Sequence, residues 1–301
     1  MNEQSIETTS DAGKANVARS RIRDYAEIFF VTVIVALLLK TFVIEAYRIP
    51  SGSMEDTLLI GDFLLVNKFI YGAQSPRYVP FTGIRLPHFR LPAFAAPRQG
   101  DVVVFEFPGN RFGERANNAM NYVKRCIATP GDTLEIIDKV VFVNGRRVPF
   151  PADAKFAGRH LYPRKYADER IYPRGSKFNE DNYGPITIPK AGATLHLDAT
   201  STQIWEDLIK REGHIVAYSS DGSVLIDGSP TTTYRVEKNC YFMMGDNRDN
   251  SLDSRFWGFV SDDQIIGKAM MVYWSWDESR TSGFMDRLAS VRWQRIATIV
   301  R

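Results

Sequence analysis

An uninterrupted apolar segment near the N-terminus constrains this chain more than any other feature. Residues 25–44 read YAEIFFVTVIVALLLKTFVI, with one acidic and one basic residue near the two ends. Twenty residues of helix span about 30 Å, the thickness of the hydrocarbon core of a bilayer. The preceding polar segment 1–24 carries four basic residues, and such a flank stays on the cytoplasmic side. The sequence therefore predicts a membrane anchor over residues 25–46, with the rest of the chain on the outer side.

A cleaved secretory signal is the alternative for this segment. Residues 28–39 alone would be long enough for the apolar core of such a signal. Ile44 and Ala46, however, make a poor small-x-small cleavage site. An uncleaved anchor is therefore favoured.

Length, charge and cysteine content exclude several classes of protein. A chain of 301 residues can form one large domain or two small ones. The net charge of +3 is too small to predict binding to nucleic acid, so we expect none. Cys126 and Cys240 alone cannot form a zinc site or a disulfide framework. We expect no metal, and a single disulfide remains open if the domain lies in an oxidising compartment.

Short β-type runs follow the anchor. Pro-Gly-Asp turns, Asn144-Gly145 and proline breaks separate runs rich in β-branched and aromatic residues. The segments predicted to form strands or hairpins are 62–72, 100–108, 120–137, 139–148, 223–236 and 240–276. Residues 73–99 carry five prolines and are predicted to be a loop.

These patterns suggest how the chain is divided. Residues 47–148 and 223–280 are predicted to form one β domain. Residues 149–222 are less regular, with helical character only over 202–213, and are predicted to be an insertion. The tail, 281–301, mixes arginines with apolar residues, which suits either an amphipathic segment at a membrane surface or a helix packed on the domain.

Two serines, Ser51 and Ser53, stand just beyond the apolar segment and raise a chemical question. A serine hydroxyl is a poor nucleophile until a base takes its proton. The four histidines lie in segments without an evident pattern: His88, His160, His196 and His214. A lysine can serve instead if burial lowers its pKa by about two units or more, at a cost of roughly 2.7 kcal/mol. Lys124 lies within the strand-like run NYVKRCIA, where alternation places Tyr122 and Cys126 on its face.

The chain resembles bacterial signal peptidase I, a membrane-bound Ser-Lys endopeptidase. The matching motifs, in the order of the family, are IPSGSMEDTLLIGDFLLVNKF, GDVVVF, YVKRCIATPGD and YFMMGDNRDNSLDSRFWGFVSDDQIIGKA. The first and last are very specific, whereas residues 73–99 and 149–222 contain no motif. The resemblance implies a mainly β fold, in which an N-terminal transmembrane helix precedes an all-β catalytic domain with an inserted α+β region. Asp56 departs from the family, which usually has proline there, and this change could alter the local turn.

The resemblance also implies roles for individual residues. Ser53 would be the nucleophile and Lys124 the general base. The Ser51 hydroxyl and the Ser53 backbone N–H would stabilise the oxyanion. Ser251 would donate a hydrogen bond to the Lys124 amine and orient it. An ion pair would hold the polar loop near the site, and apolar side chains would form the substrate pockets. The ion pair would join Asp253 to Arg255, and the pocket residues would be Tyr47, Ile49, Met54, Leu58, Tyr122 and Val123.

The implied function is removal of N-terminal signal peptides from exported preproteins with small residues at positions −1 and −3. The expected location is the bacterial cytoplasmic (inner) membrane, with a single span and the catalytic domain on the outer, periplasmic face. The expected partners are the preprotein and the lipid bilayer, with no cofactor, for a monomeric enzyme.

Two other functions remain open. A membrane-anchored Ser-His-Asp hydrolase would need an essential histidine, and no GxSxG motif surrounds either serine. A β-rich scaffold or receptor without catalysis would leave the set of Ser51, Ser53, Lys124 and Ser251 unexplained.

Overall fold

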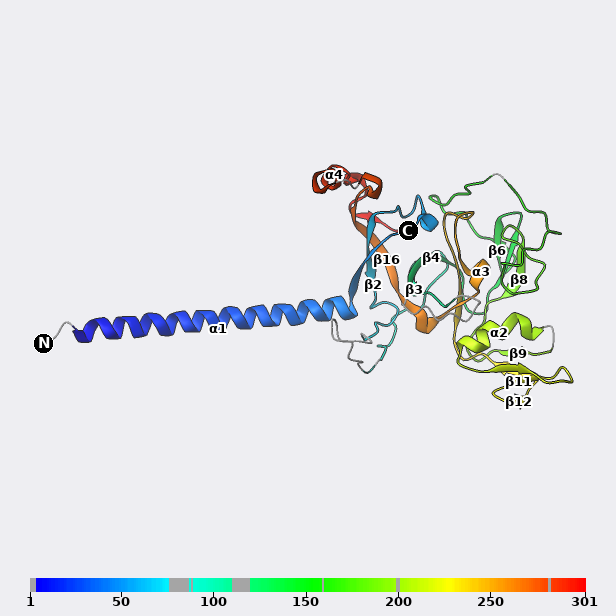
Figure 1. Cartoon of the computed structure of the whole chain (residues 1–301), viewed down its shortest axis with the longest axis horizontal. Coiled ribbons are helices and arrows are strands. Elements are labelled where there is room, and N and C mark those ends of the chain that lie inside the picture. The colour runs from blue at the N-terminus through cyan, green and yellow to red at the C-terminus, as the bar shows by residue number, and fades with distance from the viewer. Residues whose placement is uncertain are drawn as a thin grey trace.

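One long helix separates the N-terminus from the β-strands. The computed structural model describes residues 4–75, 87, 89–109, 120–158, 160–198, 201–280 and 283–301. Helix α1 runs from Gln4 to Phe42 and projects away from the other elements (Figure 1). Its part Arg23–Phe42 has a mean hydropathy of 1.9 and is long and apolar enough to cross a membrane. The helix ends before the predicted limit of the anchor at residue 46, because the chain then enters a strand at Ile44.

The largest sheet is antiparallel and contains the motif-bearing segments. Its strand order is β1-β2-β16-β3-β4-β14-β15, and β17 pairs with β16. The strands are β1 (Ile44–Arg48), β2 (Asp62–Asn67), β3 (Val102–Glu106), β4 (Asn121–Ala128), β14 (Cys240–Met244), β15 (Val260–Ser261), β16 (Ile265–Ser275) and β17 (Thr298–Ile299). The expected mainly β fold behind an N-terminal apolar helix is confirmed.

Both faces of the main sheet are buried around β3. Val102 and Val104 pack in one apolar cluster, whereas Val103 and Phe105 pack in another. Successive side chains of a strand point to opposite faces, so a strand buried on both sides is apolar throughout rather than alternating. This arrangement explains the continuous run VVVF. The two cysteines are buried in different clusters and are free thiols, so the disulfide left open by the sequence is not formed.

Smaller sheets lie to one side of the main sheet (Figure 1). A four-stranded sheet has the order β7-β6-β5-β8, β9 pairs with β13, and β10-β11-β12 form a third group. These strands are β5 (Thr133–Ile137), β6 (Val140–Val143), β7 (Arg146–Arg147), β8 (Tyr183–Thr187), β9 (Thr194–His196), β10 (Val216–Tyr218), β11 (Val224–Ile226), β12 (Ser229–Pro230) and β13 (Thr233–Arg235). Three strands of segment 149–222 pair with strands outside it, β8 with β5, β9 with β13 and β10 with β11. The segment therefore shares its sheets with both flanks.

Local turn chemistry explains two features of these sheets. The predicted hairpin at Asn144-Gly145 joins β6 to β7, with φ of 52° and 75°, the left-handed pair that a two-residue hairpin turn requires. The predicted hairpin 223–236 is shorter than expected, because its last strand β13 pairs with β9 instead. The predicted helix is present as α2 (Ser201–Arg211).

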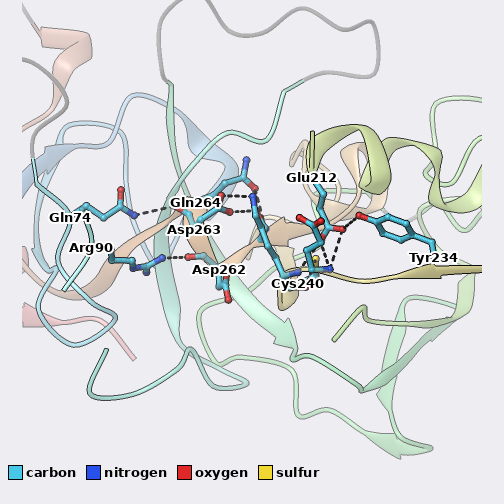
Figure 2. Close-up of polar contacts among 11 residues, drawn as sticks. Gln74, Arg90, Glu212, Tyr234, Cys240, Asp262, Asp263 and Gln264 are labelled. Atoms are coloured by element: carbon cyan, nitrogen blue, oxygen red, sulfur yellow. Dashed lines mark hydrogen bonds and ion pairs between the residues drawn. The ribbon is translucent and has the colours of Figure 1, made fainter. Parts of the chain in front are cut away.

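A polar network fastens the smaller sheets to the main sheet (Figure 2). Glu212, directly after α2, accepts a hydrogen bond of 2.9 Å from the backbone N–H of Lys238. The Lys238 amine pairs at 2.8 Å with Asp263, in the short 3-10 helix Asp262–Gln264 just before β16. Arg90, in the proline-rich loop, donates a hydrogen bond to the backbone oxygen of Asp262. Three segments far apart in the sequence thus meet at one end of β16.

The C-terminal tail packs on the main sheet. It contains α4 (Phe284–Ala289) and β17, which extends the sheet beside β16. Arg295 binds the fully buried carboxylate of Asp62, with Nη2 2.6 Å from Oδ2. Trp293 and Ile299 remain exposed. The basic residues of the tail therefore serve, at least at Arg295, to hold the tail against the domain.

Candidate active site

Ser53 lies in a short 3-10 helix, Gly52–Met54, between β1 and β2. The segment after β14 holds this helix in place. The backbone N–H of Asn247 donates to the Ser53 carbonyl oxygen at 3.1 Å, and Asn247 Nδ2 donates to the Gly52 carbonyl oxygen at 3.1 Å. Met54 is 2% exposed and packs into the core with Ile49. Packing of Met54 and hydrogen bonds from Asn247 therefore fix the position of Ser53, the candidate nucleophile.

Lys124 reaches Ser53 from β4. Its Nζ atom lies 2.6 Å from Ser53 Oγ and donates to the Val123 carbonyl oxygen at 3.2 Å. The same Nζ lies 5.5 Å from the centre of the Tyr122 ring. Lys124 is only 4% exposed, because β4 is an interior strand between β3 and β14. A lysine that is nearly dry and within hydrogen-bond reach of a serine is the geometry that a general base requires.

Burial adjusts the acidity of this lysine. Loss of water around Nζ lowers the pKa of Lys124 from 10.5 to about 8. The negative charges of Asp253 and Asp246 oppose this change, and the positive charge of Arg255 reinforces it. Desolvation is the largest cause, as expected for a cation moved out of water. A substantial fraction of the amine is therefore neutral at mildly alkaline pH.

Two donors lie near the nucleophile for a developing oxyanion. Ser51 is exposed, and its Oγ lies 3.5 Å from Ser53 Oγ. The Ser53 backbone N–H belongs to the first turn of the 3-10 helix, and such N–H groups have no acceptor within their own helix. Both groups are therefore candidate donors to a substrate carbonyl oxygen.

Asp253 and Arg255 form a buried, two-point ion pair beside the site. Arg255 Nε lies 2.9 Å from Asp253 Oδ1, and Nη2 lies 2.9 Å from Oδ2. Burial alone would raise the pKa of Asp253, but the guanidinium holds it below its usual range. Asp253 also accepts from the Gly245 backbone N–H at 3.1 Å, and Arg255 donates to the Arg248 carbonyl oxygen at 2.6 Å. Through these bonds to the backbone, the pair holds the polar loop after β14 in a fixed conformation.

A second buried ion pair was missed by sequence reasoning. Arg125 Nε and Nη2 lie 2.8 and 2.6 Å from the two carboxylate oxygens of Asp246. Thr57 Oγ1 donates to the same carboxylate at 2.6 Å, so the network joins β4 to the turn after Ser53. The available signal was the presence of two adjacent cations, Lys124 and Arg125, inside an otherwise apolar strand. Buried charges are almost always paired, which requires a carboxylate elsewhere in the chain.

The predicted hydrogen bond between Ser251 and Lys124 is not formed in this structure. Ser251 lines the same cavity as Lys124, but among the described residues its buried hydroxyl has no hydrogen-bond partner, and Lys124 uses Ser53 and Val123 instead. Ser251 packs closely against Gly245. A Cβ atom at Gly245 would lie 2.2 Å from Ser251 Oγ and 2.5 Å from the Ser53 carbonyl oxygen. Glycine at 245 therefore lets the loop approach the nucleophile.

A cavity of about 520 Å³ surrounds the two candidate residues. Five of the six predicted pocket residues line it: Tyr47, Ile49, Met54, Tyr122 and Val123. Leu58 does not line it; this residue is completely buried beneath, in the same apolar cluster as Ile49 and Met54. Polar and charged side chains occupy the other part of the cavity wall, among them Arg170, Glu180 and Asp249. A larger hollow of about 970 Å³ lies elsewhere and contains none of the candidate residues.

The histidines that the structure describes lie away from this cavity. His160, His196 and His214 are absent from its wall, and both ring nitrogens of His214 are bound to carboxylates, Asp227 at 2.6 Å and Glu237 at 3.0 Å. His88 lies outside the described residues. Within the described part of the chain, no group of three or more His, Cys, Asp or Glu side chains could hold a metal ion.

Comparisons with known proteins point to one family. A family model described as signal peptidase, peptidase S26, matches residues 22–274. Signal peptidase I of Pseudomonas fluorescens is 33% identical over 272 residues, which cover 86% of this chain and 75% of the relative. Signal peptidase I of Aquifex aeolicus is 32% identical over 259 residues, which cover 82% of each.

A crystal structure of a signal peptidase I from Enterococcus faecalis is also similar. It is 19% identical and covers 58% of this chain and 97% of the solved chain, with a TM-score of 0.25.

Proposed function

This chain belongs to the signal peptidase family, peptidase S26, and we propose that Ser53 and Lys124 perform its reaction. The protein is a serine endopeptidase that removes signal peptides. One observation carries the assignment of residues: Lys124 Nζ is 2.6 Å from Ser53 Oγ and is buried in a site that lowers its pKa to about 8.

The reaction begins with neutral Lys124. In that state the Ser53 hydroxyl donates to Nζ, and the lysine takes the proton as Oγ attacks the carbonyl carbon before the scissile bond. The Ser51 hydroxyl and the Ser53 N–H then stabilise the oxyanion, and such donors are typically worth about 3 kcal/mol each. Protonated Lys124 returns its proton to the leaving amine. A water molecule, deprotonated by the same lysine, then hydrolyses the acyl-enzyme.

The lining of the cavity supports a preference for small residues at −1 and −3. Ile49 and Met54, from the segment that carries Ser53, and Val123, from β4, all line the cavity. Their packing on the core leaves them little freedom to move, and overfilling such a site costs about 1–3 kcal/mol. A charged side chain there would also lose its water without gaining a partner. Alanine, glycine or serine therefore fits best.

The anchor supports a location at the membrane. We propose a single span through the bacterial cytoplasmic (inner) membrane, with the β domain on the periplasmic face and the chain acting as a monomer. The eleven residues from Val43 to Ser53 reach at most about 40 Å when fully extended, so the nucleophile stays near the membrane surface. The apolar core of a signal peptide lies in the bilayer, and its cleavage site lies just outside. The enzyme therefore contacts the lipid bilayer and the preprotein at the same place, the membrane surface.

Cleavage of a preprotein by the purified full-length chain tests this function. The wild-type protein should remove the signal peptide, and Ser53→Ala and Lys124→Ala should each abolish cleavage while remaining folded. The matched control replaces all four histidines and should retain most of the activity. Loss of turnover in a folded histidine variant, or cleavage by Ser53→Ala, would contradict the Ser-Lys assignment.

A further inference from the structure

We propose that Lys155 is a positioning residue whose two ion pairs hold the turn that carries Ser53. The inference rests on the proposed function, because it concerns the placement of the same hydroxyl. Lys155 belongs to segment 149–222, which no sequence motif covers. Its contacts nevertheless reach the nucleophile turn from outside the main sheet.

The turn after Ser53 has an unfavourable backbone conformation. Glu55 has φ −55° and ψ 144°, and Asp56 has φ 77°. These angles resemble the central pair of a type II turn, whose second position favours glycine. Proline, usual in the family at this position, is fixed near φ −65° and cannot adopt the conformation of Asp56. A residue with a side chain adopts a left-handed conformation only at a cost in free energy, so this turn needs support.

Lys155 supplies that support. Its Nζ lies 3.2 Å from Glu55 Oε2 and 3.2 Å from Asp56 Oδ2. Glu55 Oε2 also accepts from Asn247 Nδ2 at 3.2 Å. The carboxylates of the two central turn residues are therefore joined through one amine. Removal of the lysine would leave two adjacent negative charges that repel each other at the strained position.

The backbone of Lys155 is attached to the segment that grips Ser53. Its N–H donates to the Asp246 carbonyl oxygen at 2.9 Å, and its carbonyl oxygen accepts from the Arg248 N–H at 2.9 Å. Asn247, between these two residues, is the one that donates to the Ser53 carbonyl oxygen. Lys155 therefore supports the turn that follows Ser53 in two ways. Its side chain pairs with Glu55 and Asp56, and its backbone is bonded to the segment that holds the Ser53 carbonyl oxygen.

This arrangement affects rate more than binding. Lys155 does not line the cavity, so it is not placed to contact substrate. Its side chain is 33% exposed and those of Glu55 and Asp56 are 44% and 51% exposed, so the pairs contribute little to overall stability. A small displacement of a nucleophile, in contrast, lowers the rate of the chemical step. The signature is a fall in kcat without a change in KM.

The test compares kcat and KM of full-length variants in detergent, with one uncharged peptide substrate. In Lys155→Met we expect kcat to fall about threefold to tenfold and KM to stay within about twofold, whereas Lys155→Arg keeps most of kcat. Lys238→Met is the matched control, because the side chains of its pair with Asp263 have similar exposures of 31% and 52%. That pair lies away from the cavity, so the control should leave kcat unchanged.

Two further variants separate positioning from folding. Asp56→Asn keeps a residue that tolerates φ > 0 but removes the charge, and it should reproduce the loss in kcat even if Lys155→Met unfolds. Asp56→Gly relieves the backbone strain, so adding Lys155→Met to it should cost less than it does in the wild type. Ionic strength should lower kcat of the wild type more than that of Lys155→Met.

Several results would overturn the inference. These are full kcat in folded Lys155→Met, an equal loss in Lys155→Arg, and an equal loss in Lys238→Met. In those cases the wild type still cleaves and Ser53→Ala does not, so only the role of Lys155 fails. If the wild type does not cleave, or Ser53→Ala does, the proposed function itself fails and this inference fails with it.

Discussion

Replacing Lys124 with methionine is expected to abolish cleavage and yet to stabilise the fold at neutral pH. Methionine has nearly the length of lysine and carries no charge, so it fills the same space without needing water. The wild-type lysine, in contrast, is 4% exposed and must be protonated in a nearly dry site at pH 7. The buried charge of Lys124 therefore lowers the stability of the folded protein, although the same side chain supplies the general base.

The size and pH dependence of this cost follow from the pKa. Folding lowers the pKa of Lys124 from 10.5 to about 8, mainly by burial. Each unit is worth about 1.4 kcal/mol, so the full cost is about 3 kcal/mol. Between pH 8 and 10.5 the unfolded chain binds the proton and the folded chain does not, so stability rises with pH in this window. The destabilisation by protonated Lys124 has its full size below pH 8 and disappears above pH 10.5.

The assay is urea-induced unfolding of both full-length proteins in detergent, at pH 7.5 and at pH 10. Groups other than Lys124 titrate in both proteins and cancel in the difference. We expect Lys124→Met to be more stable by about 3 kcal/mol at pH 7.5 and by less than about 1 kcal/mol at pH 10. A difference that does not change with pH, or a variant less stable at both values, would refute the assignment of a depressed pKa to Lys124.

Three other outcomes follow from the same geometry. Ser51→Ala removes one oxyanion donor and should lower kcat about 100-fold with little change in KM; a change confined to KM would instead make Ser51 a binding residue. Arg255→Gln leaves the buried Asp253 carboxylate without its counter-ion and should lower the free energy of unfolding by about 3–5 kcal/mol in denaturant titrations, and a loss below 1 kcal/mol would count against the pair as a support of the loop. A preprotein series with Ala at −1 changed to Val, Leu, Phe and Lys should be cut progressively less well, and efficient cutting of the Leu or Lys member at the same bond would contradict the pocket assignment.

Local patterns predicted the elements, because each depends on neighbouring residues. The apolar helix, the main-sheet strands other than β1 and β17, α2 and the Asn144-Gly145 hairpin follow from period and turn chemistry. Strand β1 was not predicted, because it begins inside the segment assigned to the anchor. The partners of strands in segment 149–222 do not, since pairing over long distances is decided by the packing of the whole domain. The same holds for β17, whose two residues gain strand structure only beside β16.

The candidate site shows the same limit. The motifs indicated Ser53 and Lys124, and the alternation of β4 indicated that Tyr122 lies on the face of Lys124. Sequence could not reveal that Leu58 lies under the pocket rather than in it, or that Ser251 packs on Gly245. These details depend on the approach of separate backbones to within a few ångströms, and no local pattern encodes that distance.

The pH dependence of kcat/KM tests the central claim most directly, because it reports the ionisation of the base in the free enzyme. Neutral Lys124 is the active form, so the rate should rise about tenfold per pH unit below its pKa and level off above it. With burial lowering that pKa to about 8, the acid limb should have its midpoint near pH 8. A midpoint near the ordinary histidine value of about 6.5 would contradict Lys124 as the general base.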